Sequence, residues 1–412
     1  MITKANIRES INKPENLEQI YRNNPAKFKQ QYKKAFAGNE DSMLFRAWRA
    51  RLEFDQVRTR ALSAKDILVM LLLCFLAGTI LKIPDWTNAD NFDQFAWMIS
   101  LVPLTAMFLF TMHLRGWNQK ITGMGIGACL ILGSAVILIP EKWENSYDLA
   151  CINLFLLAWA LYGLARMGNN WHSTEKRMDF LRFSGEFTTH AGLFFLGGGI
   201  LLLLAYGLLE ILNINSSWII EDLAVYGAAS IPLVAAWATD TYSAARKLVP
   251  LTARIFSPLL LLLTLGYMGA LALNIEELFR DRDTLLTFNL LLVGVLSIAT
   301  PSSIWRENYA PSKISTAIIT AMVISAVIID IIGIWAIGWR IFEYGITANR
   351  FYVLGSNLTV FGNLAMMGMH YMRYQFQNGT LDDVERGIAR YLPVYVYWFG
   401  FTVLILPWLF RY

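Results

Sequence analysis

Asp330 is the residue whose type and position most clearly point to chemistry. It lies near the middle of a long apolar run, with two isoleucines on each side. A charged carboxylate at such a depth costs about 2.5 to 3.5 kcal/mol on insertion scales, so an acid there faces the interior of a helix bundle and is a functional candidate. Burial disfavours the ionised form, and we expect an acid that is partly protonated near neutral pH. Thr316 and Thr320 share an arc of about 80° with Asp330 on one helix, which predicts a polar seam.

A second row of polar side chains follows the predicted span 351–372. Its members fall within an arc of about 60° at helical spacing: Tyr352, Ser356, Thr359, Asn363 and His370. Two interpretations stand, a path for a solute or a proton and hydrogen bonds to neighbouring helices. The expected hydrogen-bond partners of Asp330 are Asn289, Asn363, Thr320 and Ser325.

The turn that precedes this row predicts a structured hairpin at the outer membrane face. Its polar and turn-forming residues are Arg340, Glu343, Tyr344, Gly345, Thr347, Asn349 and Arg350. Gly345 permits an unusual backbone at the helix end, and Thr347 can cap the next helix. We expect Arg340 or Arg350 to bond with Glu343 or with helix-end carbonyls.

The same hairpin carries a resemblance. The stretch from Tyr344 to Phe351 resembles the Tyr-Gly-x-Thr-x-Asn-Arg-(Phe/Tyr) hairpin of a bacterial multi-pass membrane family known as domain of unknown function 4153. The segments from Glu15 to Pro25 and from Phe45 to Leu52 are similar to N-terminal segments of its Bacteroidetes-type members. The resemblance implies an all-helical fold and a bacterial inner-membrane location, and it implies no substrate or catalytic residue.

Residue types that bind metals or nucleotides form no recognisable motif. The four histidines show no zinc spacing, the three cysteines fall in apolar runs, and there is no P-loop, nucleophile elbow or dinucleotide fingerprint. We therefore expect no metal, no cofactor, no catalytic residue of a known type and no nucleic-acid partner.

Composition defines the elements that must position these residues. The chain is 56% apolar and 16% charged, whereas a soluble domain carries about a quarter charged residues. Beyond residue 64 it breaks into apolar runs long enough to cross ~30 Å of hydrocarbon. We predict an all-α polytopic transmembrane helical bundle over 65–412. Its eleven spans are 66–82, 94–114, 121–140, 148–166, 187–212, 222–240, 255–274, 284–301, 314–338, 351–372 and 391–410.

The basic residues predict the orientation. With a cytoplasmic N-terminus, the cytoplasmic segments hold 28 of the 35 Lys and Arg residues, as the positive-inside rule requires. The odd number of spans then places the C-terminus outside. We expect a multi-pass protein of the bacterial inner (cytoplasmic) membrane, with no cleaved signal peptide.

Residues 1–64 are predicted to be a cytoplasmic helical segment with a basic excess. One interpretation is a cap that lies on anionic lipid headgroups, which attract such segments by ~1 kcal/mol per exposed base. The other is a module that docks a cytoplasmic protein, with an aromatic anchor formed by Phe28, Tyr32, Phe36 and Trp48.

Three classes of function remain open. The first is a secondary carrier or channel-like protein for a small solute or ion that uses Asp330 and the polar row. The second is a non-catalytic membrane scaffold or sensor subunit that binds a partner through residues 1–64. The third is a membrane-embedded enzyme that acts on envelope or lipid-linked substrates through Arg340, Glu343, Asn349 and Arg350. The lipid bilayer is a partner in each class, and the substrate and oligomeric state stay open.

Overall fold

The computed structural model contains helices and no strand in the residues that it describes. These residues are 62–87, 95–140, 142–211, 217–242, 245–273, 282–304, 313–377 and 379–411, and, before them, 7, 14–23, 28, 31–32, 43–44, 46–48 and 51. The all-α class predicted from the apolar runs is therefore confirmed.

Each predicted span overlaps a helix, and the last, 391–410, is divided between α16 and α17. The helices are α5 (Ala64–Trp86), α6 (Ala96–Arg115), α7 (Gln119–Ile137), α8 (Glu144–Met167), α9 (Thr174–Ile211), α10 (Ser217–Thr241), α11 (Ala245–Leu273), α13 (Arg282–Ile304), α14 (Lys313–Tyr344), α15 (Ala348–Phe376) and α16 (Leu381–Leu404). Three short helices accompany them: α2 (Pro14–Asn23), η2 (Gly168–Asn170) and α17 (Leu406–Phe410). Seven helices of the described residues are long and apolar enough to cross a membrane, namely α5 to α8, α14 and the parts 174–206 of α9 and 220–241 of α10.

Polar caps begin several of these helices. The Ser63 side chain accepts a hydrogen bond from the backbone N–H of Asp66, whose carboxylate in turn accepts from the Ser63 N–H at 3.0 Å. Thr380 and Asp383 repeat this reciprocal arrangement at the start of α16. Such capping boxes satisfy backbone N–H groups that have no partner inside the helix.

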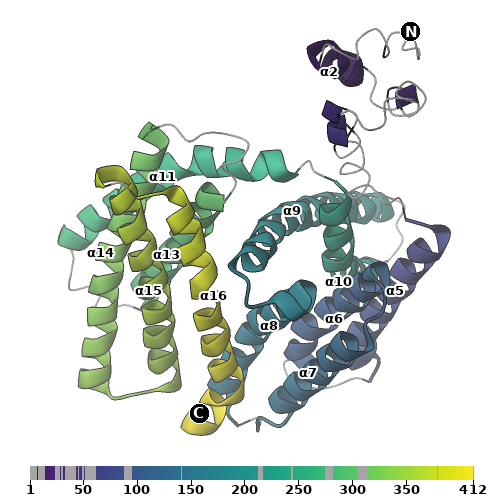
Figure 1. Cartoon of the computed structure of the whole chain (residues 1–412). Coiled ribbons are helices and arrows are strands. Elements are labelled where there is room, and N and C mark those ends of the chain that lie inside the picture. Colours follow the sequence, from purple (N-terminus) through teal and green to yellow (C-terminus); the bar gives the residue numbers. More distant parts are fainter. Residues whose placement is uncertain are drawn as a thin grey trace. The chain divides into compact units, whose positions relative to one another are not determined.

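Two apolar cores hold the bundle together. The first is built mainly by α6, α7, α8 and α9, and the second by α13, α14, α15 and α16. Helix α16 reaches both, because Val403 lies in the first core and Ile388 in the second. Figure 1 shows α16 between the green helices around α14 and α15 and the helices around α8. The polar residues of α14 and α15 therefore lie on helices that build the second core.

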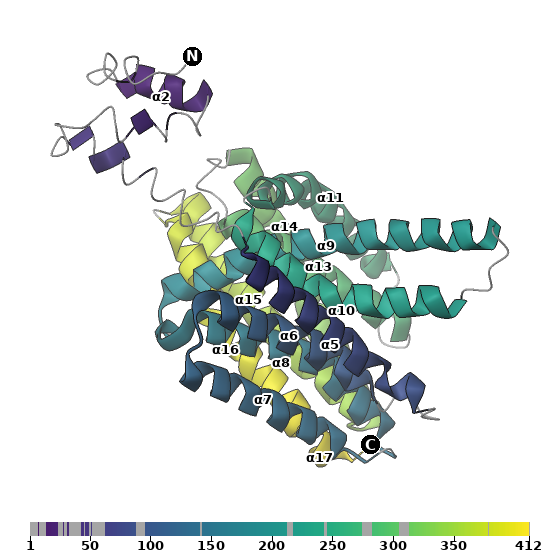
Figure 2. The same cartoon turned by 90° about the vertical axis from the view of Figure 1, so that its right-hand side faces the viewer.

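The outer surface of the bundle is apolar as well. On α9, Leu196, Leu201 and Leu203 are each about two-thirds exposed or more, at 66%, 68% and 73%. Figure 2 shows this part of α9 extending away from α8 and α16. Exposed leucine surfaces of this extent suit hydrocarbon and not water. Together with the long apolar helices, they define a multi-pass helical membrane protein.

Candidate functional site

Asp330 is fully buried near the middle of α14. Ile329 beside it and Ala326 one turn earlier belong to the second apolar core. Both carboxylate oxygens are buried, and neither has a hydrogen-bond partner among the described residues. The fold thus encloses the acid in apolar side chains and provides no partner for an anion, an arrangement that is costly unless the group is neutral or binds something.

Two further polar side chains lie at the depth of Asp330. Helices α14 and α15 are the antiparallel arms of one hairpin, and Asn363 lies as many turns from the hairpin tip as Asp330 does. The Asn363 amide donates a hydrogen bond to the Tyr395 hydroxyl at 2.9 Å, and the Asn363 carbonyl oxygen is buried without a partner among the described residues. This bond places the Tyr395 hydroxyl of α16 at the level of Asn363. Helices α14, α15 and α16 therefore each supply a polar group at this level.

The predicted hydrogen bonds to Asp330 are wrong. The Thr320 and Ser325 hydroxyls donate to backbone carbonyls of their own helix, at Thr316 and Ala321, each at 2.8 Å. Hydroxyls on helices commonly bond to the carbonyl four residues earlier, and this satisfies them locally. Asn363 donates to Tyr395, and the Asn289 side-chain oxygen has no partner among the described residues.

The two threonines of the predicted polar seam on α14 are buried, but they do not lie next to Asp330. Thr316 and Thr320 are 2% and 5% exposed. Thr320 precedes Asp330 by ten residues, a rise of about 15 Å along the helix. The two threonines therefore share a face with the acid without contacting it.

The polar row on α15 faces aromatic side chains of α16. The Trp398 indole N–H donates to the Ser356 hydroxyl at 3.0 Å, and the same indole stacks on the Tyr352 ring, with centroids 6.2 Å apart. One turn further, the Tyr391 hydroxyl donates to the Thr359 carbonyl at 2.9 Å. Each of these residues thus joins two helices.

The end of the row at His370 continues this packing. His370 lies against Gly387, where an added Cβ would come within 3.1 Å of the imidazole ring. With the bond between Asn363 and Tyr395, all five members of the row contact α16. Sequence reasoning missed the partner row on α16, although Tyr391, Tyr395 and Trp398 follow the helical spacing of four and three that could have identified it.

The hairpin between α14 and α15 is closed by its own residues. Gly345 adopts a positive φ of 78°, which a side chain would oppose, and the Thr347 hydroxyl caps α15 by accepting from the Arg350 N–H at 3.3 Å. The Arg350 guanidinium donates to the carbonyls of Tyr344 and Gly345 at 2.8 and 2.7 Å. The predicted bond between an arginine and helix-end carbonyls is therefore confirmed.

The other hairpin residues do not converge on one point. Asn349 donates to the Asn145 side chain of α8 at 3.2 Å. Glu343 is exposed, and Arg340 lies one turn before the end of α14. The guanidinium of Arg350 donates its hydrogen bonds to carbonyls of the turn, and Asn349 bonds to α8. Two of the four residues predicted to act in an enzyme are therefore engaged in contacts within the protein.

Two polar contacts between helices, made by titratable side chains, were not predicted from the sequence. Lys82 near the end of α5 is 7% exposed and bonds Asp222 of α10 at 2.8 Å, as well as Asp85 of its own helix. At the other end of α5, Asp66 accepts from the His113 ring of α6 at 2.9 Å. All five residues lie at the edges of apolar runs, where the sequence alone does not show which of them meet.

The aromatic residues of the N-terminal segment form a core of their own. The chain divides into two compact units, Met1–Leu62 with Asp240–Tyr242, and the remainder. In the first unit, Phe28, Tyr32 and Trp48 are at most 5% exposed and pack together with Leu17. These three side chains stabilise the segment, and Phe36, the fourth predicted anchor, lies outside the described residues.

Within the described residues, no three His, Cys, Asp or Glu side chains lie close enough together to hold a metal ion. The geometry thus defines a class: a multi-pass helical membrane protein in which the Asp330 carboxyl lies in the core without a hydrogen-bond partner among the described residues. Comparison with protein-family models, with curated proteins and with solved structures finds no match.

Proposed function

We propose that this protein is a proton-linked secondary carrier, or a channel-like protein, for a small solute or ion. The observation that carries the proposal is the Asp330 carboxyl, fully buried and without a partner among the described residues. Ionisable groups at bilayer depth are costly and usually mark ion pathways or proton relays. Here the acid takes up and releases the coupling proton, and Asn363 and Tyr395 provide polar groups beside it.

The location belongs to the same proposal. The protein resides in a bacterial inner membrane and crosses it eleven times, with the N-terminus cytoplasmic and the C-terminus outside. Support comes from the uneven distribution of the 35 Lys and Arg residues. The resemblance of the outer hairpin to the bacterial family adds to it.

Labelling with a hydrophobic carbodiimide tests the acid directly, because this reagent modifies protonated carboxyls in apolar surroundings. We expect a mass adduct on Asp330 that diminishes as the pH is raised and is lost in Asp330→Asn. Asp179→Asn removes an exposed carboxyl, 57% accessible, and serves as the matched control. No adduct on Asp330 at any pH would refute proton binding there.

Transport is measured in proteoliposomes with an imposed pH gradient and a pool of labelled metabolites. Asp330→Asn retains the size of the side chain and removes its titration, so we expect normal melting and loss of pH-dependent uptake. Asp179→Asn should retain both.

A second candidate is a non-transporting membrane scaffold or sensor subunit, with residues 1–64 as its docking segment. The observation that favours it is the bonding of the α15 row to α16, since side chains committed to a neighbouring helix do not line an open path. Under this proposal Asp330→Asn is silent or slightly stabilising, and a partner co-purifies in fixed proportion with the full chain but not with a variant that lacks residues 1–61.

A further inference from the structure

Four buried oxygen atoms without a hydrogen-bond partner among the described residues lie on three neighbouring helices. They are both carboxylate oxygens of Asp330 on α14, the side-chain oxygen of Asn363 on α15 and that of Asn289 on α13. Asp330 is fully buried, and Asn363 is 3% exposed. Buried acceptors that lack a donor are costly and rare, so four of them in one core favour a ligand.

Packing contacts bring Asp330 and Asn363 to nearly the same height in the bundle. Val323 of α14 lies against Gly368 of α15, where an added Cβ would be 3.6 Å from a Val323 methyl carbon. Asp330 follows Val323 by seven residues, about two turns, so it lies on the same face of α14. Asn363 precedes Gly368 by five residues. Because the two helices are antiparallel, Asp330 and Asn363 differ in height by two residues, or about 3 Å.

Helix α13 adds Asn289 near this height. The Phe288 ring of α13 lies directly against Gly333 of α14. Asn289 is one residue from Phe288, and Asp330 is three residues from Gly333. The two side chains therefore start within about 6 Å of one another along the helix axes.

Hydrogen atoms alone do not satisfy these oxygens. The Tyr395 hydroxyl of α16 accepts from the Asn363 amide at 2.9 Å and has one hydrogen of its own to donate. A protonated Asp330 supplies one more, while its other oxygen stays an acceptor. Two hydrogens then face three acceptors. The Thr320 and Ser325 hydroxyls add none, because both donate within α14.

The chemistry of the groups suits a cation with a single charge. Carboxylate and amide oxygens are ligands of hard cations, and one cation satisfies several of them at once. The other buried acidic and lysine residues that the structure describes, Asp66, Lys82 and Glu186, belong to α5 and α9. The Asp330 carboxylate thus balances one positive charge, whereas a divalent ion would leave an excess charge in an apolar core.

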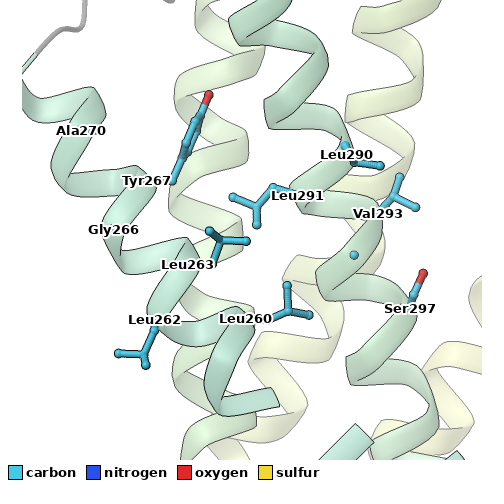
Figure 3. Close-up of a pocket in the computed structure, with 11 residues that line it drawn as sticks. Leu260, Leu262, Leu263, Gly266, Tyr267, Ala270, Leu290, Leu291, Val293 and Ser297 are labelled. Atoms are coloured by element: carbon cyan, nitrogen blue, oxygen red, sulfur yellow. The ribbon is translucent and has the colours of Figure 1, made fainter. Parts of the chain in front are cut away.

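A groove of about 780 Å³ between α11 and α13 is a separate feature. Figure 3 shows it between the two helices, with Leu263 and Tyr267 on α11 and Leu290 and Ser297 on α13. Its lining has no charged residue, and none of it comes from α14, α15 or α16. The groove therefore lacks the carboxylate that would balance a cation.

We propose that the side-chain oxygens of Asp330, Asn363 and Asn289 bind one alkali-metal cation. The Tyr395 hydroxyl engages the amide nitrogen of Asn363 and leaves the amide oxygen free as a ligand. The cation and a proton exclude each other at the Asp330 carboxylate. This site rests on the proposed function in that both use Asp330, and it names a coupling ion, but cation binding is measurable without transport.

Equilibrium binding of radioactive sodium, and of radioactive rubidium in place of potassium, tests the site on the full-length protein in detergent. With choline chloride holding the ionic strength constant at pH 8, we expect saturable binding of one ion per chain. Asp330→Asn should abolish it, and Asn363→Leu should weaken it by at least about tenfold through the loss of a contact to a charged group. Ser325→Ala is the matched control, because it removes a buried hydroxyl that donates within α14, and should bind as the wild type does.

Carbodiimide labelling adds a readout that needs no variant. A bound cation occupies the carboxylate that the reagent modifies. At one fixed pH, the chloride of the alkali ion that binds should therefore reduce the adduct on Asp330. Choline chloride and calcium chloride should leave the adduct unchanged.

The outcomes separate the cation site from the proposed carrier. If Asp330 forms the adduct but neither ion binds or protects it, the cation site is overturned and proton binding stands. Undiminished binding by a folded Asp330→Asn protein, or displacement by calcium at equal concentration, overturns the site for a monovalent cation. Binding that depends on Asp330 in a protein that transports nothing supports the site and refutes the carrier. Neither adduct nor binding overturns both.

Discussion

Replacement of Gly355 by alanine tests how tightly α15 and α16 pack. Gly355 lies on α15 directly against the Trp398 indole, and an added Cβ would overlap the ring. The tryptophan would have to move, and its hydrogen bond to Ser356 would lengthen or break. The α15 row would then lose one of its hydrogen bonds to α16.

The magnitude follows from three opposing contributions. Overpacking costs about 1 to 3 kcal/mol. The loss of one hydrogen bond costs about 0.5 to 1.5 kcal/mol. Alanine is favoured over glycine inside a helix by about 1 kcal/mol, which offsets part of the loss. We expect Gly355→Ala to lower the free energy of unfolding by about 0.5 to 3.5 kcal/mol.

The assay is the fraction of monodisperse protein that remains after graded heating in detergent. Gly338→Ala is the matched control, because an added Cβ at this position of α14 would meet nothing within 4 Å, so only the helix preference acts. Gly355→Ala combined with Trp398→Leu should recover part of the loss, since the smaller side chain relieves the overlap. If Gly355→Ala melted no lower than Gly338→Ala, the close packing of α15 on α16 would be refuted.

Three further predictions address the hairpin, the orientation and the start of α16. Arg350→Ala removes two charge-assisted bonds to the carbonyls of Tyr344 and Gly345 and should lower the melting temperature, with a loss of about 1 kcal/mol at this exposed position; unchanged melting would contradict the role of the guanidinium. In a cysteine-free background, Tyr344→Cys should react with an impermeant maleimide in intact cells and Lys176→Cys only after permeabilisation, and the reverse pattern would overturn the orientation. Hydrogen bonds from the Thr380 hydroxyl and backbone lower the pKa of Asp383, so its contribution to stability is present at neutral pH and is lost as the pH falls through that lowered value. The melting temperature of the wild type should therefore decrease more than that of Asp383→Asn between pH 7 and pH 3, and parallel curves would exclude a stabilising carboxylate.

Features that depend on local sequence were predictable. Apolar runs identify helices because hydrocarbon leaves no other way to satisfy the backbone. The turn at Gly345 and the cap at Thr347 are equally local, since each follows from the conformational freedom or hydrogen-bonding capacity of one residue. The helix end expected at Gly345 is local too: α14 ends at Tyr344, and the predicted membrane span 314–338 is the apolar part of that helix.

Contacts between distant residues were not predictable. Asn363 and Tyr395 lie on different helices, and Lys82 and Asp222 are far apart in the chain. The sequence shows that each has a polar group and does not show which group it meets. Asp330 was identified by its depth in an apolar run, yet its lack of a partner depends on hydroxyls that bond within their own helix.

The two acidic partners of Lys82 have a consequence for the insertion of the chain. Synthesis proceeds from the N-terminus, so α5 enters the membrane before α10 exists. A lysine at the end of a span extends its ammonium group toward the interface, where an acidic neighbour still stabilises its charge. Asp85, one turn further on the same helix, is present from the start and can neutralise it, whereas Asp222 arrives with α10. Helix α5 can therefore enter the membrane with its lysine already paired, and the same lysine binds Asp222 once α10 is present.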